Sequence, residues 1–300
     1  MNIVALVKKL PRFFRRHKLL QLLLVLFPQE HIQLVRFNGD AYLFGDLLDA
    51  DVRSYFMWES FEPEFFVIAR PFLEKGGVFF DAGANFGFCS FGLMSLLPHG
   101  NVEYHLFEAN PYLCTMLKRS AGLYASQQSF INNVCLSDTK GVSKLFFTHH
   151  RYAQAYVAER GKVTVLNLKL DDYIQEHHIA RIDFLKLDIE GMEVAALKGL
   201  RISLNQGIIK VILMEISRTT FPREGVTIED GLRLLYEAGF RLFYVKEIDF
   251  KRPDVAKRAI FLDVGGAKLR VAEVSADEKI EGGVYQSDIL AIHSSSELLS

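Results

Sequence analysis

Residues 78–87 read Val-Phe-Phe-Asp-Ala-Gly-Ala-Asn-Phe-Gly, an apolar run closed by polar residues and glycines, with helix-compatible sequence behind it. This layout predicts a buried parallel strand whose carboxyl end carries a ligand pocket. Gly83 and Gly87 would let the backbone approach a ligand where a Cβ would collide, and Asp81 can accept hydrogen bonds from an ammonium or a hydroxyl. Asn85 stands where a dinucleotide turn has its second glycine, so the turn favours a cofactor without phosphates.

A second carboxylate follows the next predicted strand. Residues 102–107 alternate loosely and lead into Glu108, and Ala109-Asn110-Pro111 behind it is typical of a helix start. A carboxylate at the tip of the second strand, about twenty residues after the first glycine turn, is placed to bind both hydroxyls of a ribose. The two motifs together predict an adenosine-containing ligand.

Five motifs follow one another between about residues 62 and 217. They are Asp81-Ala-Gly-Ala-Asn-Phe-Gly87, Phe107-Glu-Ala-Asn-Pro111, Cys135-Leu-Ser-Asp138, Leu170-Asp-Asp-Tyr173 and Lys186-Leu-Asp-Ile-Glu-Gly-Met-Glu193. In this order and spacing they resemble the FkbM family of S-adenosylmethionine-dependent methyltransferases. The resemblance implies an α/β fold with a Rossmann-like seven-stranded sheet and an antiparallel C-terminal edge hairpin. It also implies S-adenosyl-L-methionine as cofactor and methyl transfer, usually to a hydroxyl of a glycan, glycolipid or secondary metabolite.

The predicted cofactor-binding residues come from the glycine turn, the second strand tip and two flanking segments. Asn133, within the third strand, is expected to reach the adenine edge, and Glu62 belongs to a Glu-Pro element that looks like the one preceding the cofactor strand in the family. The full set is Asp81, Gly83, Ala84, Asn85, Gly87, Glu108, Asn133 and Glu62.

The candidate catalytic residues are Asp188, Glu190 and Glu215, all at predicted strand tips. Methyl transfer from a sulfonium requires a held donor, an aligned acceptor and removal of the acceptor's proton. Asp188 and Glu190 are two apart and can point to one side, and repulsion between them raises one pKa towards that of a useful base. Capping of the following helix remains the alternative for Glu190. The three carboxylates could bind magnesium, but nothing in the sequence demands a metal and none is predicted.

Helical and strand-like patterns alternate along the chain, as a parallel sheet requires. Residues 1–60 are interpreted as an N-terminal basic and amphipathic helical extension, and residues 61–300 as the methyltransferase domain. Residues 251–286 are interpreted as an insertion between the last two strands. Residues 144–147 and 163–168 read as extended pieces flanking a polar loop over residues 149–161.

Composition limits the partners and the compartment. The net charge of −1 over 300 residues argues against a general nucleic-acid binder. The three cysteines are widely spaced and form no C-x-x-C pair, which favours a reduced, cytoplasmic setting. The expected partner is a small-molecule or glycan acceptor.

The N-terminal arm differs from the rest of the chain. Residues 1–29 contain six Lys or Arg and no acid, which leaves −7 for the remainder. The apolar run 19–27 is far shorter than the roughly twenty residues that cross a bilayer. The favoured interpretation is a helix packed on the body of the protein. The alternative is an interfacial helix within residues 8–27 that contacts anionic lipid at the inner face of the membrane.

Two other functions fit parts of the pattern. One is an NAD-dependent oxidoreductase on a related Rossmann sheet, although Asn85 in place of glycine and the acids Asp188 and Glu190 count against it. The other is a non-catalytic membrane-associated binding module. Retention of Asp81, Glu108 and Asp188 weighs against a decayed pocket.

Overall fold

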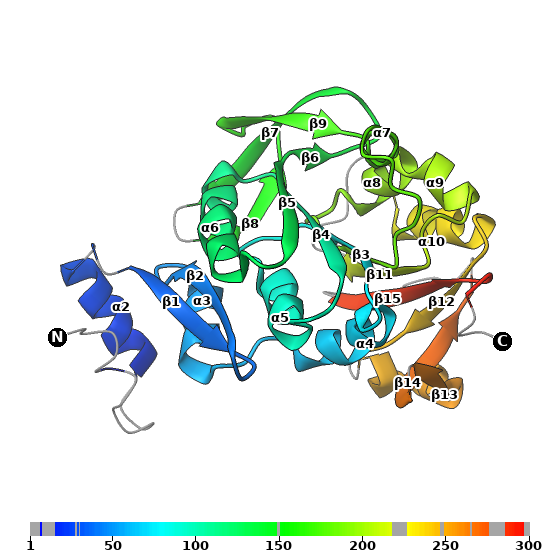
Figure 1. Ribbon diagram of the computed structural model, residues 1–300, viewed down its shortest axis with the longest axis horizontal. Coiled ribbons are helices and arrows are strands. Elements are labelled where there is room, and N and C mark those ends of the chain that lie inside the picture. The colour runs from blue at the N-terminus through cyan, green and yellow to red at the C-terminus, as the bar shows by residue number, and fades with distance from the viewer. Residues whose placement is uncertain are drawn as a thin grey trace.

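The computed structural model describes residue 7 and residues 16–27, 29, 31–148, 151–217, 227–246, 249–264, 266–275 and 286–296. At its centre lies a mixed sheet of nine described strands (Figure 1). In spatial order these are β13 (Ala259–Val264), β14 (Ala267–Val274), β12 (Phe240–Tyr244), β15 (Gln286–His293), β11 (Val211–Ser217), β10 (Phe184–Leu187), β3 (Gly77–Ala82), β4 (Val102–Glu108) and β5 (Gln128–Asn133).

The sheet topology confirms the predicted α/β, Rossmann-like class. From β5 to β11 neighbouring strands are parallel, whereas β15 runs antiparallel to both β11 and β12. Two details differ from the expectation. The antiparallel C-terminal strand lies inside the sheet, and the residue 251–286 insertion contributes the hairpin β13–β14, which pairs with β12 and extends the sheet beyond seven strands. Ahead of this hairpin lie η3 (Asp249–Lys251), which ends where the segment begins, and α11 (Pro253–Lys257).

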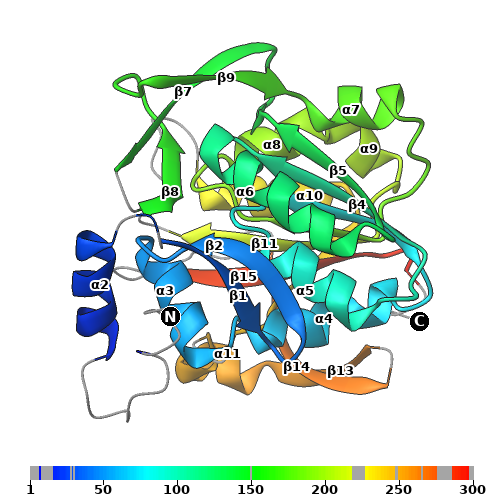
Figure 2. The same cartoon turned by 60° about the vertical axis from the view of Figure 1, so that its left-hand side comes forward.

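Helices cover both faces of the sheet, because its central strands are apolar on both sides (Figure 2). In β3, Phe79 belongs to the core on one face and Phe80 to the core on the other. The helices of the first face are α4 (Pro63–Leu73), α5 (Phe88–Leu96) and α6 (Pro111–Ala121), which is followed by η2 (Gly122–Tyr124). Those of the second face are α7 (Leu170–Glu176), α8 (Glu193–Gly199), α9 (Arg201–Asn205) and α10 (Ile228–Glu237).

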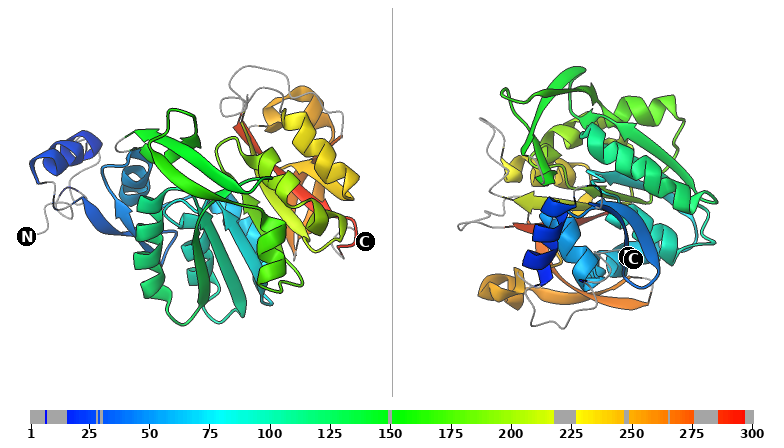
Figure 3. Two further views of the ribbon diagram at one scale, coloured as in Figure 1. Left: turned by 90° about the horizontal axis from the view of Figure 1, so that it is seen from above. Right: turned by 90° about the vertical axis from the view of Figure 1, so that its left-hand side faces the viewer.

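The N-terminal extension is only partly helical. It consists of α2 (Arg16–Leu26), an antiparallel hairpin of β1 (Ile32–Phe37) and β2 (Ala41–Asp46), and α3 (Ala50–Trp58). Phe37 is fully buried, with its ring 4.9 Å from that of Phe88 in α5. Asp46 is also fully buried and accepts a hydrogen bond from the Tyr112 hydroxyl of α6 at 2.7 Å. The hairpin therefore packs on the same core as the sheet, while α2 lies at the edge of the molecule (Figure 3).

A small second sheet arches over the carboxyl edge of the large one. Its order is β6 (Cys135–Leu136), β9 (Val163–Leu168), β7 (Gly141–Thr148) and β8 (Arg151–Val157). The predicted polar loop over residues 149–161 is wrong for residues 151–157, which form β8. That strand pairs antiparallel with β7, and Val157 opposite Leu145 packs into a small apolar cluster. Residues 149 and 150 lie outside the described residues.

Candidate functional site

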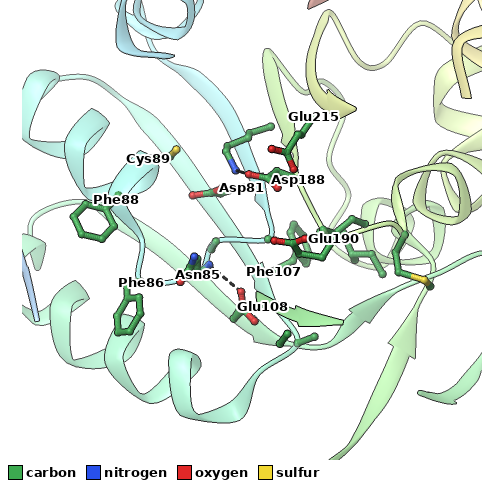
Figure 4. A pocket seen from close by; sticks show the side chains of 18 of the residues that line it. Asp81, Asn85, Phe86, Phe88, Cys89, Phe107, Glu108, Asp188, Glu190 and Glu215 are labelled. Atoms are coloured by element: carbon green, nitrogen blue, oxygen red, sulfur yellow. Dashed lines mark hydrogen bonds and ion pairs between the residues drawn. The ribbon is translucent and has the colours of Figure 1, made fainter. Parts of the chain in front are cut away.

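A cavity of about 390 Å³ lies at the carboxyl ends of β3, β4, β10 and β11 (Figure 4). This volume falls within the range of small-molecule sites. The cavity wall contains nine of the predicted site residues, namely Glu62, Asp81, Gly83, Ala84, Asn85, Glu108, Asp188, Glu190 and Glu215. Their convergence follows from the parallel topology, because the carboxyl ends of parallel strands meet at one edge of a sheet.

The two glycines of the turn are required by the protein's own packing. A Cβ at Gly83 would collide with the backbone oxygen of Asp188, and one at Gly87 would collide with the rings and methyl groups of Phe91 and Leu117. Both glycines also have positive φ, +81° and +90°. We expected these glycines to make room for a ligand, but their surroundings indicate that they make room for other parts of the protein. Gly83 instead lets the tips of β3 and β10 approach each other, and Gly87 does not line the cavity.

Glu108 joins the glycine turn to the start of α6. Its Oε2 accepts a hydrogen bond from the backbone N–H of Asn85 at 2.8 Å, and its Oε1 accepts one from the N–H of Asn110 at 2.7 Å. Burial raises the pKa of Glu108 to about 7. The turn N–H that would face a pyrophosphate in a dinucleotide site is thus taken by a carboxylate. This arrangement speaks against the NAD alternative.

Asp81 offers an unused acceptor to the cavity. Its side chain is 1% exposed, and its Oδ2 accepts a hydrogen bond from the Ser90 hydroxyl at 2.5 Å. Its Oδ1 is buried with no hydrogen-bond partner, as is Oδ1 of Asn85 beside it. Burial raises the pKa of Asp81. Because buried polar atoms are normally paired, these two oxygens indicate a place where a ligand supplies hydrogen-bond donors.

Lys186 contributes a cation to the cavity wall, and sequence reasoning did not select it as a site residue. Its Nζ lies 2.8 Å from Oδ2 of Asp188. Burial opposes the charge of Lys186, but the neighbouring Asp188 raises its pKa well above the usual value. Burial would likewise raise the pKa of Asp188, yet Lys186 and a hydrogen bond from Glu215 lower it. Asp188 is therefore held as an anion and is a poor proton acceptor at neutral pH.

Glu190 has the opposite environment. Its pKa is raised to about 7, first by burial and then by the negative charges of Asp188 and Glu193. Its backbone φ is 52°, in the left-handed region that non-glycine residues rarely adopt. Of the two acids Asp188 and Glu190, it is therefore Glu190 whose pKa is raised, with like-charge repulsion as the second cause after burial. The general-base assignment itself stays a prediction.

Glu193 supports the loop that carries these acids. Its Oε1 accepts hydrogen bonds from the backbone N–H groups of Ile189 and Gly191, at 2.9 and 3.2 Å. The side chain is 2% exposed and therefore belongs to the interior of the protein. At the start of α8, it is therefore the Glu193 side chain, and not that of Glu190, that accepts hydrogen bonds from the preceding loop.

Asn133 does not reach the cavity. Its side-chain amide donates to the backbone oxygens of Glu108 and Ala109 at 3.0 and 2.9 Å, which ties the tip of β5 to that of β4. The neighbouring residues Val134 and Leu136 line the cavity instead. An apolar wall at this position suits contact with the face of an adenine ring better than hydrogen bonding to its edge.

Residues from two distant segments complete the cavity wall. Asp49, Asp51, Val52 and Tyr55 come from the start of α3 and the turn before it, and Ala155, Tyr156 and Val157 come from β8. The two segments meet where Oδ2 of Asp49 accepts a hydrogen bond from the Tyr152 N–H at 3.2 Å. No local motif marks these residues, because their place depends on contacts across about a hundred positions of sequence.

Metal ligation has no geometric support in the part of the chain that the structure describes. Within it, no three His, Cys, Asp or Glu side chains are grouped so that they could hold a metal ion.

Known proteins resemble this chain in sequence and in structure. The sequence profile described as the methyltransferase FkbM domain matches residues 81–242. No curated protein matches the chain. Among solved structures, the methyltransferase FkbM from Methylobacillus flagellatus is 16% identical with a TM-score of 0.36, over 55% of this chain and 41% of that one.

Two other solved structures are similar at the same low level. TrmK from M. capricolum, in complex with S-adenosyl-homocysteine, is 10% identical with a TM-score of 0.39, over 78% of this chain and 69% of that one. A TehB-like SAM-dependent methyltransferase from Corynebacterium glutamicum is 10% identical with a TM-score of 0.39, over 79% of this chain and 92% of that one.

Proposed function

This chain belongs to the FkbM methyltransferase family, as its motifs predicted, and we propose that it transfers a methyl group from S-adenosylmethionine to a hydroxyl of a glycan, glycolipid or secondary metabolite. When bound, S-adenosylmethionine supplies an activated methyl group on a sulfonium. The protein must then hold the donor, align the acceptor and accept the acceptor's proton.

The donor end of the cavity fits this cofactor. The bridge from Glu108 to the Asn85 N–H is the observation that carries the proposal, because it leaves a carboxylate facing the cavity where a dinucleotide site has a free N–H. The remaining lone pairs of Glu108 are available to ribose hydroxyls. The unpartnered Oδ1 of Asp81 is available to an ammonium or a hydroxyl.

The cluster of Asp81, Lys186 and Asp188 favours a cationic donor. With both carboxylates ionised, the three groups carry one surplus negative charge, in a site where burial limits screening by solvent. Asp188 is proposed to act as a fixed anion that orients Lys186 and favours positive charge beside it.

Glu190 is the proposed general base. A base is most effective when its pKa lies near the working pH, and the pKa of Glu190 is raised to about 7. Glu215 lies beside Asp188, near the carboxyl end of β11, and is proposed to align the acceptor (Figure 4). Both glutamates line the cavity together with Glu62.

Two measurements test the proposal. Calorimetry should give saturable binding of S-adenosylhomocysteine and none of NAD, because the turn N–H is already paired. Mass spectrometry of small-molecule and glycan extracts, incubated with the protein and S-adenosylmethionine, should then reveal acceptors that gain one methyl group. Tight binding of NAD without binding of S-adenosylhomocysteine would reject the assignment. Peripheral contact with a membrane is a separate proposal, since it depends on α2 and not on the cavity.

A further inference from the structure

Helix α2 has two apolar sides, and only one of them is covered by the protein. Leu20 and Leu24 are buried in the main core. Leu22 and Leu26 are 57% and 61% exposed, and Phe27, directly after the helix, is 37% exposed. Lys18 is exposed as well and precedes Leu22 and Leu26 at spacings of four, so these three side chains lie on one face. We call Lys18, Leu22, Leu26 and Phe27 the α2 face.

The sequence that contains α2 is strongly basic. Six Lys or Arg and no acid lie within residues 1–29, against −7 for the rest of the chain. Exposed leucine and phenylalanine beside lysine and arginine are the composition of helices that lie in the interface of an anionic bilayer. Each cation near such a surface is attracted to the anionic headgroups, and the lysine stem can bury its methylenes while its ammonium stays in water.

We propose that the α2 face docks this protein on an anionic lipid surface. The contact is interfacial, because none of the described helices has the length and apolar character to cross a membrane. The helix projects at the periphery of the molecule, where a flat surface can reach it (Figures 1 and 3). The charge of the arm complements acidic headgroups, and the exposed leucines complement the acyl boundary beneath them.

Docking at this place brings the cavity close to the lipid. Helix α2 packs against α3, and Asp51, Val52 and Tyr55 of α3 line the cavity. One helix therefore separates the docked surface from the wall of the site. An acceptor anchored in the bilayer would be presented to the cavity from this side.

Vesicle sedimentation of the full chain tests the proposal. The probes are vesicles of phosphatidylcholine alone and of phosphatidylcholine mixed with phosphatidylglycerol. The protein is expected to sediment with the mixed vesicles only, and binding should weaken as salt screens the charges. The double variant Leu22→Glu/Leu26→Glu should lose binding by about tenfold or more, since two apolar contacts are replaced by two repelled charges.

The matched control places the same two charges on other exposed apolar residues. Leu166 in β9 and Phe261 in β13 are 66% and 70% exposed, so Leu166→Glu/Phe261→Glu changes the net charge equally without touching α2. It should retain most of the binding, and both variants should bind S-adenosylhomocysteine like the parent. The proposal is overturned if the parent ignores the mixed vesicles, if both variants lose binding equally, or if Leu22→Glu/Leu26→Glu abolishes self-association of the protein and not vesicle binding.

Discussion

The two ends of the cavity use carboxylates in different ways. At the donor end, Asp81 and Glu108 accept hydrogen bonds from the protein itself. At the proposed acceptor end, Glu190 has a positive φ value of 52°, and no hydrogen bond of its carboxylate is found among the described residues. Strained backbone of this kind persists only where the surrounding structure holds it. The proposed donor end is therefore preorganised, whereas the proposed acceptor end keeps the Glu190 carboxylate available for a substrate and its proton.

Removal of Glu108 should have the largest effect on binding at the donor end. In Glu108→Ala, the backbone N–H groups of Asn85 and Asn110 lose their acceptor, at a cost of about 1–3 kcal/mol each. The ribose hydroxyls lose theirs as well. We expect the Kd of S-adenosylhomocysteine to rise by about a hundredfold or more in calorimetry. Glu237→Ala, at an exposed position of α10, is the control. Parental affinity in Glu108→Ala would mean that the donor binds elsewhere.

The donor end was also the more predictable of the two. Asp81, Asn85 and Glu108 follow strands whose apolar runs are recognisable, and parallel topology brings such tips together. Sequence alone could not supply the reason for Gly83, because its constraint is the backbone of Asp188 about a hundred residues away.

The acceptor end depends on segments that no local pattern connects. Asp49 before α3 and Tyr156 in β8 line one cavity only through tertiary contact, which includes the hydrogen bond from the Tyr152 N–H to Asp49. The strand β8 itself was predicted as loop, because its polar residues obscure the alternation around Val157. Lys186 was overlooked for another reason. It lies inside the strand β10, where a lysine only interrupts the apolar sequence pattern. Its ion pair with Asp188 is visible only in the structure.

Asp188→Asn tests the anion that lies between the two ends. We expect turnover to fall by up to about a thousandfold, the upper range for loss of one fixed electrostatic contact. The free energy of unfolding should fall by about 2 kcal/mol, since Lys186 is left buried without its anion. This is less than for a fully buried pair, because the Asp188 side chain is 35% exposed. Denaturant unfolding and methyl-transfer assays measure the two effects.

A double variant separates stability from chemistry at Asp188. In Lys186→Met/Asp188→Asn the ion pair is replaced by two neutral side chains, so most of the lost stability should recover while turnover stays low. Unchanged turnover in Asp188→Asn would remove Asp188 from the mechanism. Recovery of turnover in the double variant would show that Asp188 matters only for folding.

Glu190→Gln should lower turnover at the proposed acceptor end without changing cofactor binding at the donor end. A base works in its ionised form, so the parental rate should rise as pH passes through about 7, the pKa of Glu190, and level off above it. The variant should lose about a hundredfold in kcat above that pH and show no such rise, with an unchanged Kd for S-adenosylhomocysteine. A rise near pH 7 that survives in Glu190→Gln would belong to another group.

The smallest expected effect concerns Glu193, which supports the loop between the two ends without lining the cavity. Its pKa is raised from 4.5 to about 7 by burial, so the folded state binds the proton more tightly than the unfolded chain. The resulting stabilisation is fully present below about pH 4.5 and is lost as pH rises towards 7.

In Glu193→Gln the amide oxygen can still accept from Ile189 and Gly191, but the side chain no longer titrates. Above about pH 7 the variant should therefore be more stable than the parent by about 1–3 kcal/mol in denaturant unfolding, and this advantage should shrink towards about pH 5. Glu237→Gln, at the exposed position, should show no such pH-dependent gain. An advantage of Glu193→Gln that is the same at both pH values would mean that the amide improves packing, and that burial of an ionised carboxylate is not what limits the stability of this loop.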